Sequence, residues 1–203
     1  LTENADYMVI DISTNTMTVK TPYENEFQFN ITNNEPFHLM NLLFSIALAC
    51  ESGARSHHII PAFKNYNNVE GRFKICNGFN NSSIIDSSYN ANPASFRASI
   101  DSLISMGSNS WVIMGQMGEL GADSEEHHVE LAHYAAKKGV EKLFLLTEHN
   151  DAISQAFNSE TYSFSNKSDL VRFIKPLLKN NTNVLIKASR YMKFETIVDE
   201  LIS

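Results

Sequence analysis

The chain has 203 residues and a formal net charge of −7, which is enough length for one large domain or two small ones with a real hydrophobic core. Its charges form neither an acidic nor a basic tail, so we expect no nucleic-acid partner. No apolar run is long enough to span a bilayer and no signal-peptide pattern opens the chain, so we expect no membrane insertion. Cys50 and Cys76 lack metal-ligand and CxxC spacing, which favours free thiols in a reducing compartment and a cytoplasmic location.

The first third of the chain predicts a small α+β unit. Three apolar or alternating segments, separated by turn residues, predict a β-meander over 7–12, 17–19 and 27–31. Because a lone three-stranded meander is only marginally stable, we expect it to belong to a larger sheet. A helix with one apolar face then runs from Leu39 to Cys50 and ends near Gly53.

A second, shorter helix is expected over 57–66, followed by an Asn-rich, glycine-containing connector at 67–72. Connectors of this composition commonly separate domains. We therefore predict two domains, 1–70 and 71–203.

From Phe73 onward, strands and helices alternate with short loops. This alternation predicts an α/β fold with a doubly wound, mostly parallel, Rossmann-like sheet and helices on both faces. The expected strands are 83–85, 111–114, 142–146, 161–164 and 184–187. The expected helices are 93–106, 124–138, 151–157, 169–178 and 192–202.

Several residues predict where these helices begin and end. Asn92 is a suitable cap for a helix whose first residue is Pro93, because proline has no N–H to leave unpaired there. Asp123 and Glu126 have the spacing of a capping box. Pro176 lies inside a helical pattern and should break it.

Three loops should meet at one edge of the predicted sheet, because the carboxyl ends of parallel strands lie together. They are the segments 86–92, 115–121 and 187–190. They supply hydroxyls, amides, flexible backbone and two cations, Lys187 and Arg190, next to helix N-termini. These groups suit an anionic ligand such as a nucleotide or a carboxylate.

Each loop also has an ordinary interpretation, since Asn- and Ser-rich segments often only turn a corner. The glycines of 115–121 have GxxGxxG rather than GxGxxG spacing, which argues against a Rossmann-type oxidoreductase. The adjacent pairs His57-His58 and His127-His128 cannot each share one metal ion, so no metal site is expected. No serine occupies a nucleophile elbow, so no catalytic triad is expected. The residues alone predict an anion-binding α/β domain.

The loops, taken together with Gly71-Arg72, resemble the motifs of the Mur ligases. The C-terminal domain of that family carries DDSYNANP, then GDMxELG followed by a serine, acids and a histidine, and finally KGSR. Here they stand as DSSYNANP at 86–93, GQMGELG at 115–121 with His128 downstream, and KASR at 187–190. The family's GxHNxxN helix start falls on 35–41, so the resemblance covers nearly the whole chain.

The resemblance implies an ATP-dependent ligase that joins D-alanyl-D-alanine to UDP-N-acetylmuramoyl-tripeptide, with ATP and Mg²⁺ as cofactors. The chain has no GxxxxGK[ST] phosphate-binding loop. We therefore expect 1–70 to be the end of a central ATPase domain and 71–203 a complete C-terminal domain. Such a fragment should be inactive alone.

The resemblance also assigns roles residue by residue. Arg72 is expected at the terminal phosphate of ATP as the catalytic group. The expected nucleotide-binding residues are Ser87, Tyr89, Asn90 and Asn92. The residues expected on the D-alanyl-D-alanine side are Lys187, Ser189 and Arg190. The residues expected to orient or to stabilise structure are Asn41, Asp86, Glu119 and His128.

Four departures from the family motifs leave an alternative open. Ser87 replaces the second aspartate of DDSYNANP, Gln116 replaces the aspartate of GDM, and Ala188 replaces the glycine of KGSR. Phe37-His38 stand where the family has His-Asn. The alternative is a catalytically silent paralogue that binds a nucleotide or a partner.

Overall fold

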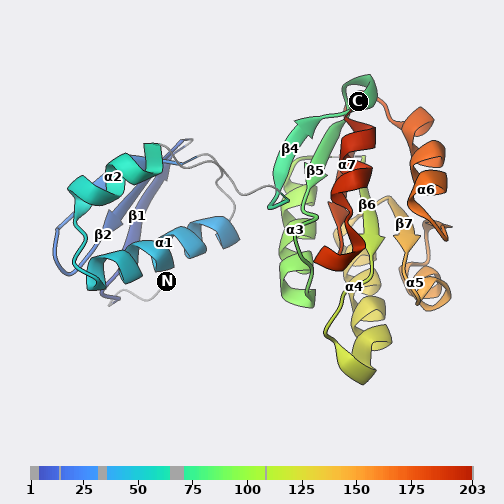
Figure 1. Ribbon diagram of the computed structural model, residues 1–203, viewed down its shortest axis with the longest axis horizontal. Coiled ribbons are helices and arrows are strands. Elements are labelled where there is room, and N and C mark those ends of the chain that lie inside the picture. The colour runs from blue at the N-terminus through green and yellow to red at the C-terminus, as the bar shows by residue number, and fades with distance from the viewer. Residues whose placement is uncertain (1–4, 14, 32–35, 65–70, 108, 203) are drawn as a thin grey trace. The chain divides into compact units, whose positions relative to one another are not determined.

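The structure is a computed structural model that describes residues 5–13, 15–31, 36–64, 71–107 and 109–202. The chain divides into two compact units, Leu1–Asn68 and Val69–Ser203, which Figure 1 shows in blue to cyan and in green to red. Each unit has its own hydrophobic core. The end of the second predicted helix and most of the predicted connector lie outside the described residues.

The first unit is a three-stranded antiparallel sheet with two helices. Its strands are β1 (Met8–Ser13), β2 (Thr16–Lys20) and β3 (Phe27–Asn30), in the order β1-β2-β3. The helices are α1 (Pro36–Glu51) and α2 (Ser56–Lys64). This confirms the predicted meander and helices over the described residues.

The expectation of a larger sheet is wrong for the described part of this chain. Side chains that alternate along β2 and β3, such as Met17 and Phe29, are buried together with the apolar face of α1 and with Ile59 of α2. Phe29 also stacks on Phe63 of α2, with ring centroids 4.4 Å apart. The two helices therefore supply the burial that further strands were expected to give.

Local hydrogen bonds determine where the helices of this unit end and begin. Gly53, with φ of +96°, follows α1 in the left-handed conformation that glycine adopts without a steric cost. The carboxylate of Glu24 then accepts hydrogen bonds from the backbone N–H and the hydroxyl of Ser56, each at 2.7 Å. An acid at a helix N-terminus satisfies an otherwise unpaired donor and interacts favourably with the helix dipole.

The second unit is built on a six-stranded sheet in the order β4-β5-β9-β6-β7-β8. Only the β4–β5 pair is antiparallel, and the other four pairs are parallel. The strands are β4 (Lys74–Asn77), β5 (Ser83–Asp86), β6 (Ser110–Gly115), β7 (Lys142–Leu146), β8 (Glu160–Ser163) and β9 (Asn183–Lys187). The predicted α/β, doubly wound, mostly parallel fold is confirmed, and β4 is an addition to it.

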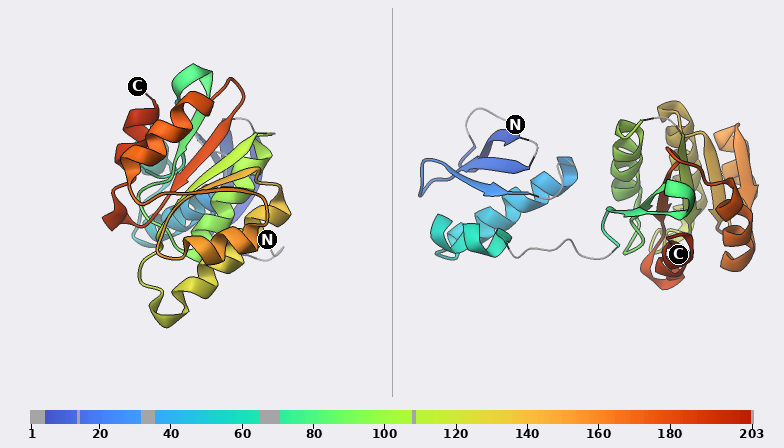
Figure 2. Two further views of the ribbon diagram at one scale, coloured as in Figure 1. Left: turned by 90° about the vertical axis from the view of Figure 1, so that its right-hand side faces the viewer. Right: turned by 90° about the horizontal axis from the view of Figure 1, so that it is seen from above.

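Helices cover both faces of this sheet (Figure 2). Helices α3 (Pro93–Ser105), α4 (Ser124–Lys138) and α5 (Asn150–Phe157) pack on one face, and α6 (Lys167–Ile174) and α7 (Glu195–Leu201) on the other. Neighbouring strand residues point to opposite faces, so Ile85 joins the first helix layer and Ile84 the second. None of the described helices is long and apolar enough to cross a membrane.

The predicted helix boundaries are mostly confirmed. Asn92 accepts a hydrogen bond from the backbone N–H of Ser95 at 2.8 Å, and the Ser95 hydroxyl accepts from the Asn92 N–H in return. Helix α6 ends at Ile174, and a 3₁₀ turn containing Pro176 follows. The capping box at Asp123 is wrong, because a 3₁₀ turn over Gly121–Asp123 holds Asp123 at φ −88° and ψ 12° rather than in the extended conformation of a side-chain cap.

Candidate functional site

The three motif loops lie at one edge of the second unit's sheet. Strand β9 lies between β5 and β6 and is parallel to both. The segments that leave these strands, 87–92, 188–190 and 116–121, are therefore neighbours. This confirms the prediction that the loops meet, although they come from distant parts of the sequence.

Ser189 connects the three loops. Its backbone N–H donates to the Gln116 carbonyl at 3.0 Å, and its hydroxyl accepts from the Gly118 N–H at 2.7 Å. The same hydroxyl donates to the Ala91 carbonyl at 3.4 Å. The Ser189 side chain is buried, so this residue holds the backbone of the edge in one arrangement.

Lys187 is a buried cation directly beneath the loop that follows β5. It is only 4% exposed, and its Nζ donates to the Ser87 hydroxyl at 3.1 Å and to the Asn90 carbonyl at 2.8 Å. Burial lowers the pKa of Lys187 to about 8, and the nearby charge of Arg72 acts in the same direction. Ser87 is buried as well, so its hydroxyl faces Lys187 inside the protein.

Tyr89 brings two arginines together on the surface above. The Arg72 guanidinium carbon lies 4.6 Å from the centre of the Tyr89 ring, and that of Arg190 lies 5.7 Å from it. Such cation–π contacts orient a guanidinium without neutralising it. Tyr89 and both arginines are exposed, and Arg190 also forms an ion pair with Glu195 at 3.4 Å.

Gly71 makes this arrangement possible. Its φ is +74°, and a Cβ built on it would lie 2.7 Å from the Tyr89 nitrogen. The Tyr89 N–H donates to the Gly71 carbonyl at 3.0 Å. Only glycine combines this backbone conformation with this close approach, so Gly71 sets the position of Arg72 relative to Tyr89.

The polar residues around Tyr89 shape its loop. Asp86 accepts hydrogen bonds from the Ser88 N–H at 3.0 Å and from the Ser88 hydroxyl at 2.6 Å, which closes a turn. The Asn90 side chain accepts from the Ala91 N–H at 2.9 Å, and Asn92 caps α3. Asn90 and Asn92 are exposed, whereas Asp86 is buried.

His128 supports the loop that follows β6. It is fully buried, its Nε2 accepts from the Met117 N–H at 3.0 Å, and its Nδ1 lies 2.7 Å from the Ser124 carbonyl. These two contacts require a neutral ring with its proton on Nδ1, and burial lowers the pKa of His128 below 6.5. Glu119 lies in the same loop, exposed, with φ of +63°. Asn41 is exposed on α1 of the other unit.

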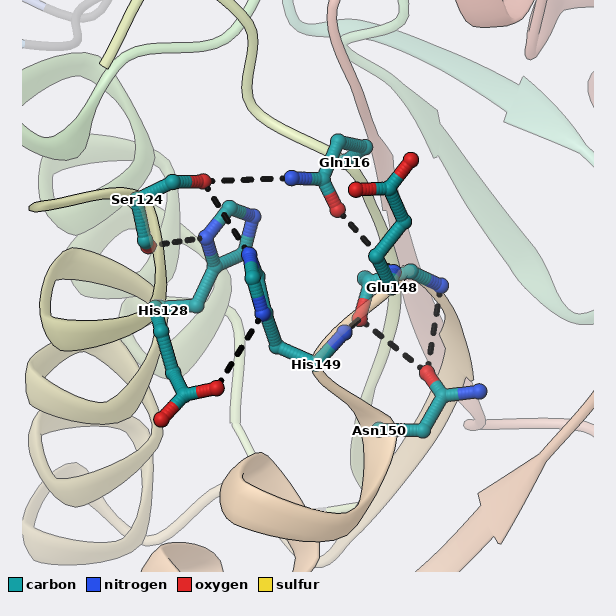
Figure 3. A network of polar contacts seen from close by, with 8 residues as sticks. Gln116, Ser124, His128, Glu148, His149 and Asn150 are labelled. Carbon is teal, nitrogen blue, oxygen red and sulfur yellow. Dashed lines mark hydrogen bonds and ion pairs between the residues drawn. The ribbon is translucent and has the colours of Figure 1, made fainter. Parts of the chain in front are cut away.

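A second polar network extends from the same loop toward β7 (Figure 3). The Gln116 side chain donates from Nε2 to the Ser124 hydroxyl at 3.2 Å and accepts at Oε1 from the Glu148 N–H at 3.1 Å. The Ser124 hydroxyl lies 3.2 Å from His149 Nε2, and His149 Nδ1 lies 3.4 Å from a carboxylate oxygen of Glu125.

These residues line a groove of about 630 Å³ that also includes Gly118, Glu119 and Tyr191. Sequence reasoning matched Ser124 to the serine of the family motif without giving it a role, and it missed His149. The available signal was a polar segment, Glu148-His149-Asn150, placed directly after a predicted parallel strand. A single histidine in such a segment has no spacing that distinguishes it from a surface residue.

The described residues contain no group of three or more His, Cys, Asp or Glu side chains that could hold a metal ion. Mg²⁺ usually binds one or two carboxylates together with substrate phosphates, so the described side chains do not form a complete magnesium site by themselves. The side chains of this edge instead offer the cations Arg72, Lys187 and Arg190 around the β5 loop and a histidine-containing groove beside the β6 loop.

Comparison with known proteins finds relatives for most of the chain. It is 30% identical over 165 residues to the UDP-N-acetylmuramoyl-tripeptide–D-alanyl-D-alanine ligase of Escherichia coli, covering 80% of this chain and 36% of that protein. It is 27% identical to the Bacillus subtilis ligase of the same name, covering 97% of this chain and 45% of that protein. The chain thus spans less than half the length of these relatives.

Solved structures support the same fold. MurF from Acinetobacter baumannii superimposes with a TM-score of 0.84 at 21% identity, covering 99% of this chain and 46% of that one. MurF ligase from Thermotoga maritima, solved in complex with ADP, gives 0.76 at 20% identity, covering 98% and 46%. The protein family described as Mur ligase, glutamate ligase domain, matches residues 71–190, which is more than half of the chain, and the protein therefore belongs to the Mur ligase family.

Proposed function

We propose that the chain is part of an ATP-dependent ligase that adds D-alanyl-D-alanine to UDP-N-acetylmuramoyl-tripeptide during the cytoplasmic synthesis of peptidoglycan precursors. The observation that carries this proposal is the meeting of three Mur ligase motif loops at one sheet edge, where Arg72, Lys187 and Arg190 surround Tyr89 and its loop. The names of the relatives point to the same reaction.

The proposal assigns 1–70 to the end of a central ATPase domain and 71–203 to the C-terminal domain. The chain has no P-loop motif, so we expect it to be inactive alone. ATP would phosphorylate the terminal carboxylate of the tripeptide, and the amine of D-alanyl-D-alanine would then displace phosphate. Mg²⁺ would accompany ATP on residues outside the described part of this chain.

The exposed residues of the edge are the ones that we assign to substrates. Tyr89, Asn90 and Asn92 would contact the nucleotide, and Arg72 its terminal phosphate, for which a planar guanidinium is well suited. Arg190 would hold the carboxylate of the incoming dipeptide. The main contribution of such groups is positioning and electrostatic stabilisation.

The buried residues of the edge would act by holding that surface in place. Lys187 and Ser87 support the Tyr89 loop from inside, and Ser189 joins the three loops. His128 and Asp86 fix the loops after β6 and β5. Glu119, at the rim of the groove, would orient a substrate, and Asn41 would have an orienting or structural role within the central domain.

The test uses the longer parent protein with ATP, magnesium, tripeptide nucleotide and D-alanyl-D-alanine. Phosphate release and ligated product should both require all of these components. Arg190→Ala should raise KM for the dipeptide by about tenfold, as expected for the loss of one charge-assisted contact. The control is Arg172→Ala, because Arg172 is 79% exposed and forms an ion pair with Asp169 of the same helix. Absence of product from the unaltered parent under these conditions would refute the proposal.

A silent paralogue remains the second candidate because Ser87 supplies a neutral hydroxyl to Lys187 where the family motif has an acid. In that case the parent would bind nucleotide and release no phosphate. An active unaltered parent rules this candidate out.

A further inference from the structure

The groove beside the β6 loop contains a chain of hydrogen bonds whose direction can be derived from its fixed end. The backbone N–H of Glu148 can only donate, so the Gln116 atom that it contacts is the amide oxygen. The Gln116 nitrogen must therefore donate to the Ser124 hydroxyl. The hydroxyl keeps its own proton, which it donates to its other partner, His149 Nε2, when that nitrogen carries no proton.

The far end of the chain agrees with this direction. His149 Nδ1 faces the Glu125 carboxylate at 3.4 Å, and a carboxylate only accepts hydrogen bonds. A carboxylate beside Nδ1 favours the tautomer with the ring proton there, in which the Nε2 lone pair faces the Ser124 hydroxyl. A carboxylate that holds one ring nitrogen while the other accepts a proton is the arrangement that orients histidine as a base.

The other basic groups nearby, His128 and Lys187, already have hydrogen-bond partners at their nitrogens. Both ring nitrogens of His128 contact the backbone, and the Lys187 amine is buried with two hydrogen-bond partners. Among the described side chains that line the groove, His149 is the only imidazole. Imidazole is also the side chain whose protonation changes near neutral pH.

The groove suits the approach of an amine. Its lining includes the carboxylates of Glu119, Glu125 and Glu148, and none of the described residues that line it is lysine or arginine. It also adjoins the β9 loop, because Gly118, which lines the groove, donates to Ser189. An ammonium group would therefore enter the groove while a carboxylate of the same molecule remained near Arg190.

We infer that His149, oriented by Glu125 and reached through the Ser124 hydroxyl, accepts the proton that must leave the attacking amine in the ligation. The inference rests on the proposed function and names a base for it. The ammonium group gives one proton to Ser124 while Ser124 passes its own proton to His149 Nε2, which leaves a free amine and an imidazolium beside Glu125.

The remaining steps balance without a further reagent. The amine nitrogen forms a bond to the acyl carbon, the bond from that carbon to the phosphate oxygen breaks, and the phosphate leaves with the electron pair. The nitrogen also transfers its second proton to the phosphate, which departs as hydrogen phosphate. His149 then returns its proton to solvent through the groove.

Gln116 has a specific part in this chain of contacts. An aspartate at this position, as in the motif that the loop resembles, could only accept hydrogen bonds. It would take the Ser124 proton for itself and turn the hydroxyl away from His149. Gln116→Asp should therefore interrupt the connection while leaving the groove intact.

The experiment separates the two half-reactions of the parent enzyme. Hydroxylamine traps the acyl phosphate as a hydroxamate and reports the first half-reaction, and peptide formation with D-alanyl-D-alanine reports the second. His149→Gln should leave the hydroxamate yield unchanged and lower kcat for peptide formation by about 100-fold, the usual effect of removing a general base. Gln116→Asp should act in the same direction. The exposed His133→Gln on α4 is the control and should change neither value.

The pH profile distinguishes a base from a structural support. The acidic limb of the kcat profile for peptide formation should disappear in His149→Gln and shift in Glu125→Gln. Glu125 is 65% exposed, so the second variant should fold normally and remains informative if the first does not fold. Peptide formation by folded His149→Gln at the unaltered rate, with the unaltered pH profile, would overturn the inference. An unaltered parent that forms no hydroxamate would overturn the proposed function and this inference with it.

Discussion

The buried amine of Lys187 gives the sharpest test of the energetics of this edge. One pKa unit corresponds to about 1.4 kcal/mol, so the fall from 10.5 to about 8 means that the charged amine costs folding roughly 3 kcal/mol at neutral pH. Lys187→Met keeps the length of the side chain and removes the charge. It also loses two hydrogen bonds, each worth about 1 kcal/mol. We therefore expect the variant to be more stable at pH 7 by about 1 kcal/mol.

The pH dependence gives the sign of the effect. The unfolded chain keeps the lysine proton to about pH 10.5, whereas the folded chain releases it near pH 8, because the pKa of Lys187 is lowered by burial. The unfolded state thus binds more protons between these values, and the stability of the unaltered chain gains the roughly 3 kcal/mol as the pH rises through this window. The advantage of Lys187→Met should shrink and reverse over the same range.

Urea unfolding followed by Trp111 fluorescence measures this, because Trp111 is the single tryptophan and lies on β6 of the second unit. Lys179→Met, at an exposed lysine, is the matched control and should show no such dependence. A Lys187→Met variant that is less stable than the unaltered chain by the same amount at pH 7 and at pH 9.5 would refute the reasoning. It would mean that the hydrogen bonds from Lys187 to Ser87 and Asn90 fully offset the cost of burying its charge.

Three further stability predictions use the same assay. Gly71→Ala should cost about 2 kcal/mol and more than Gly139→Ala in the same unit, because a Cβ at Gly71 meets the Tyr89 nitrogen at 2.7 Å while Gly139 has open space; equal costs would contradict the close approach. Asn92→Ala should lose about 1 kcal/mol and Asn92→Asp should recover most of it, unless the cap is not formed in solution. Burial lowers the pKa of His128 in the folded chain, so the unfolded chain binds the histidine proton at a higher pH. As the pH falls from 7 to 5, the unaltered chain should therefore lose stability relative to His128→Gln. Parallel plots of stability against pH for the two proteins would show that His128 is not buried in its neutral form.

The sequence predicted the parts of the fold that depend on local patterns. Consecutive residues in buried runs such as Ile84–Ile85 and Trp111–Met114 are all apolar. Both faces of the strand are then apolar, which is typical of a parallel strand covered by helices. Asn92 with Pro93 located the start of α3. Strand β4 could not be predicted in this way, because Lys74–Asn77 is an edge strand that is mostly exposed and has no apolar alternation.

The site shows the same division between local and long-range information. The meeting of the three loops follows from the topology of a parallel sheet alone. The contact between Ser124 and His149 does not, since it forms only when α4 and the end of β7 are packed side by side. The pairing of Arg72 and Arg190 across Tyr89 likewise depends on the left-handed backbone of Gly71, and no residue pattern encodes that distance.

The position of β9 also has a consequence for biosynthesis. Strand β9, the last strand of this sheet in chain order, is inserted between β5 and β6, so Lys187 meets Ser87 across 100 residues of sequence. Until β9 has been synthesised, the edges of β5 and β6 that pair with it have no partner strand. Unpaired strand edges are prone to aggregation. The second unit should therefore fold only after its final segment emerges, which makes nascent chains that stall before β9 natural clients of chaperones.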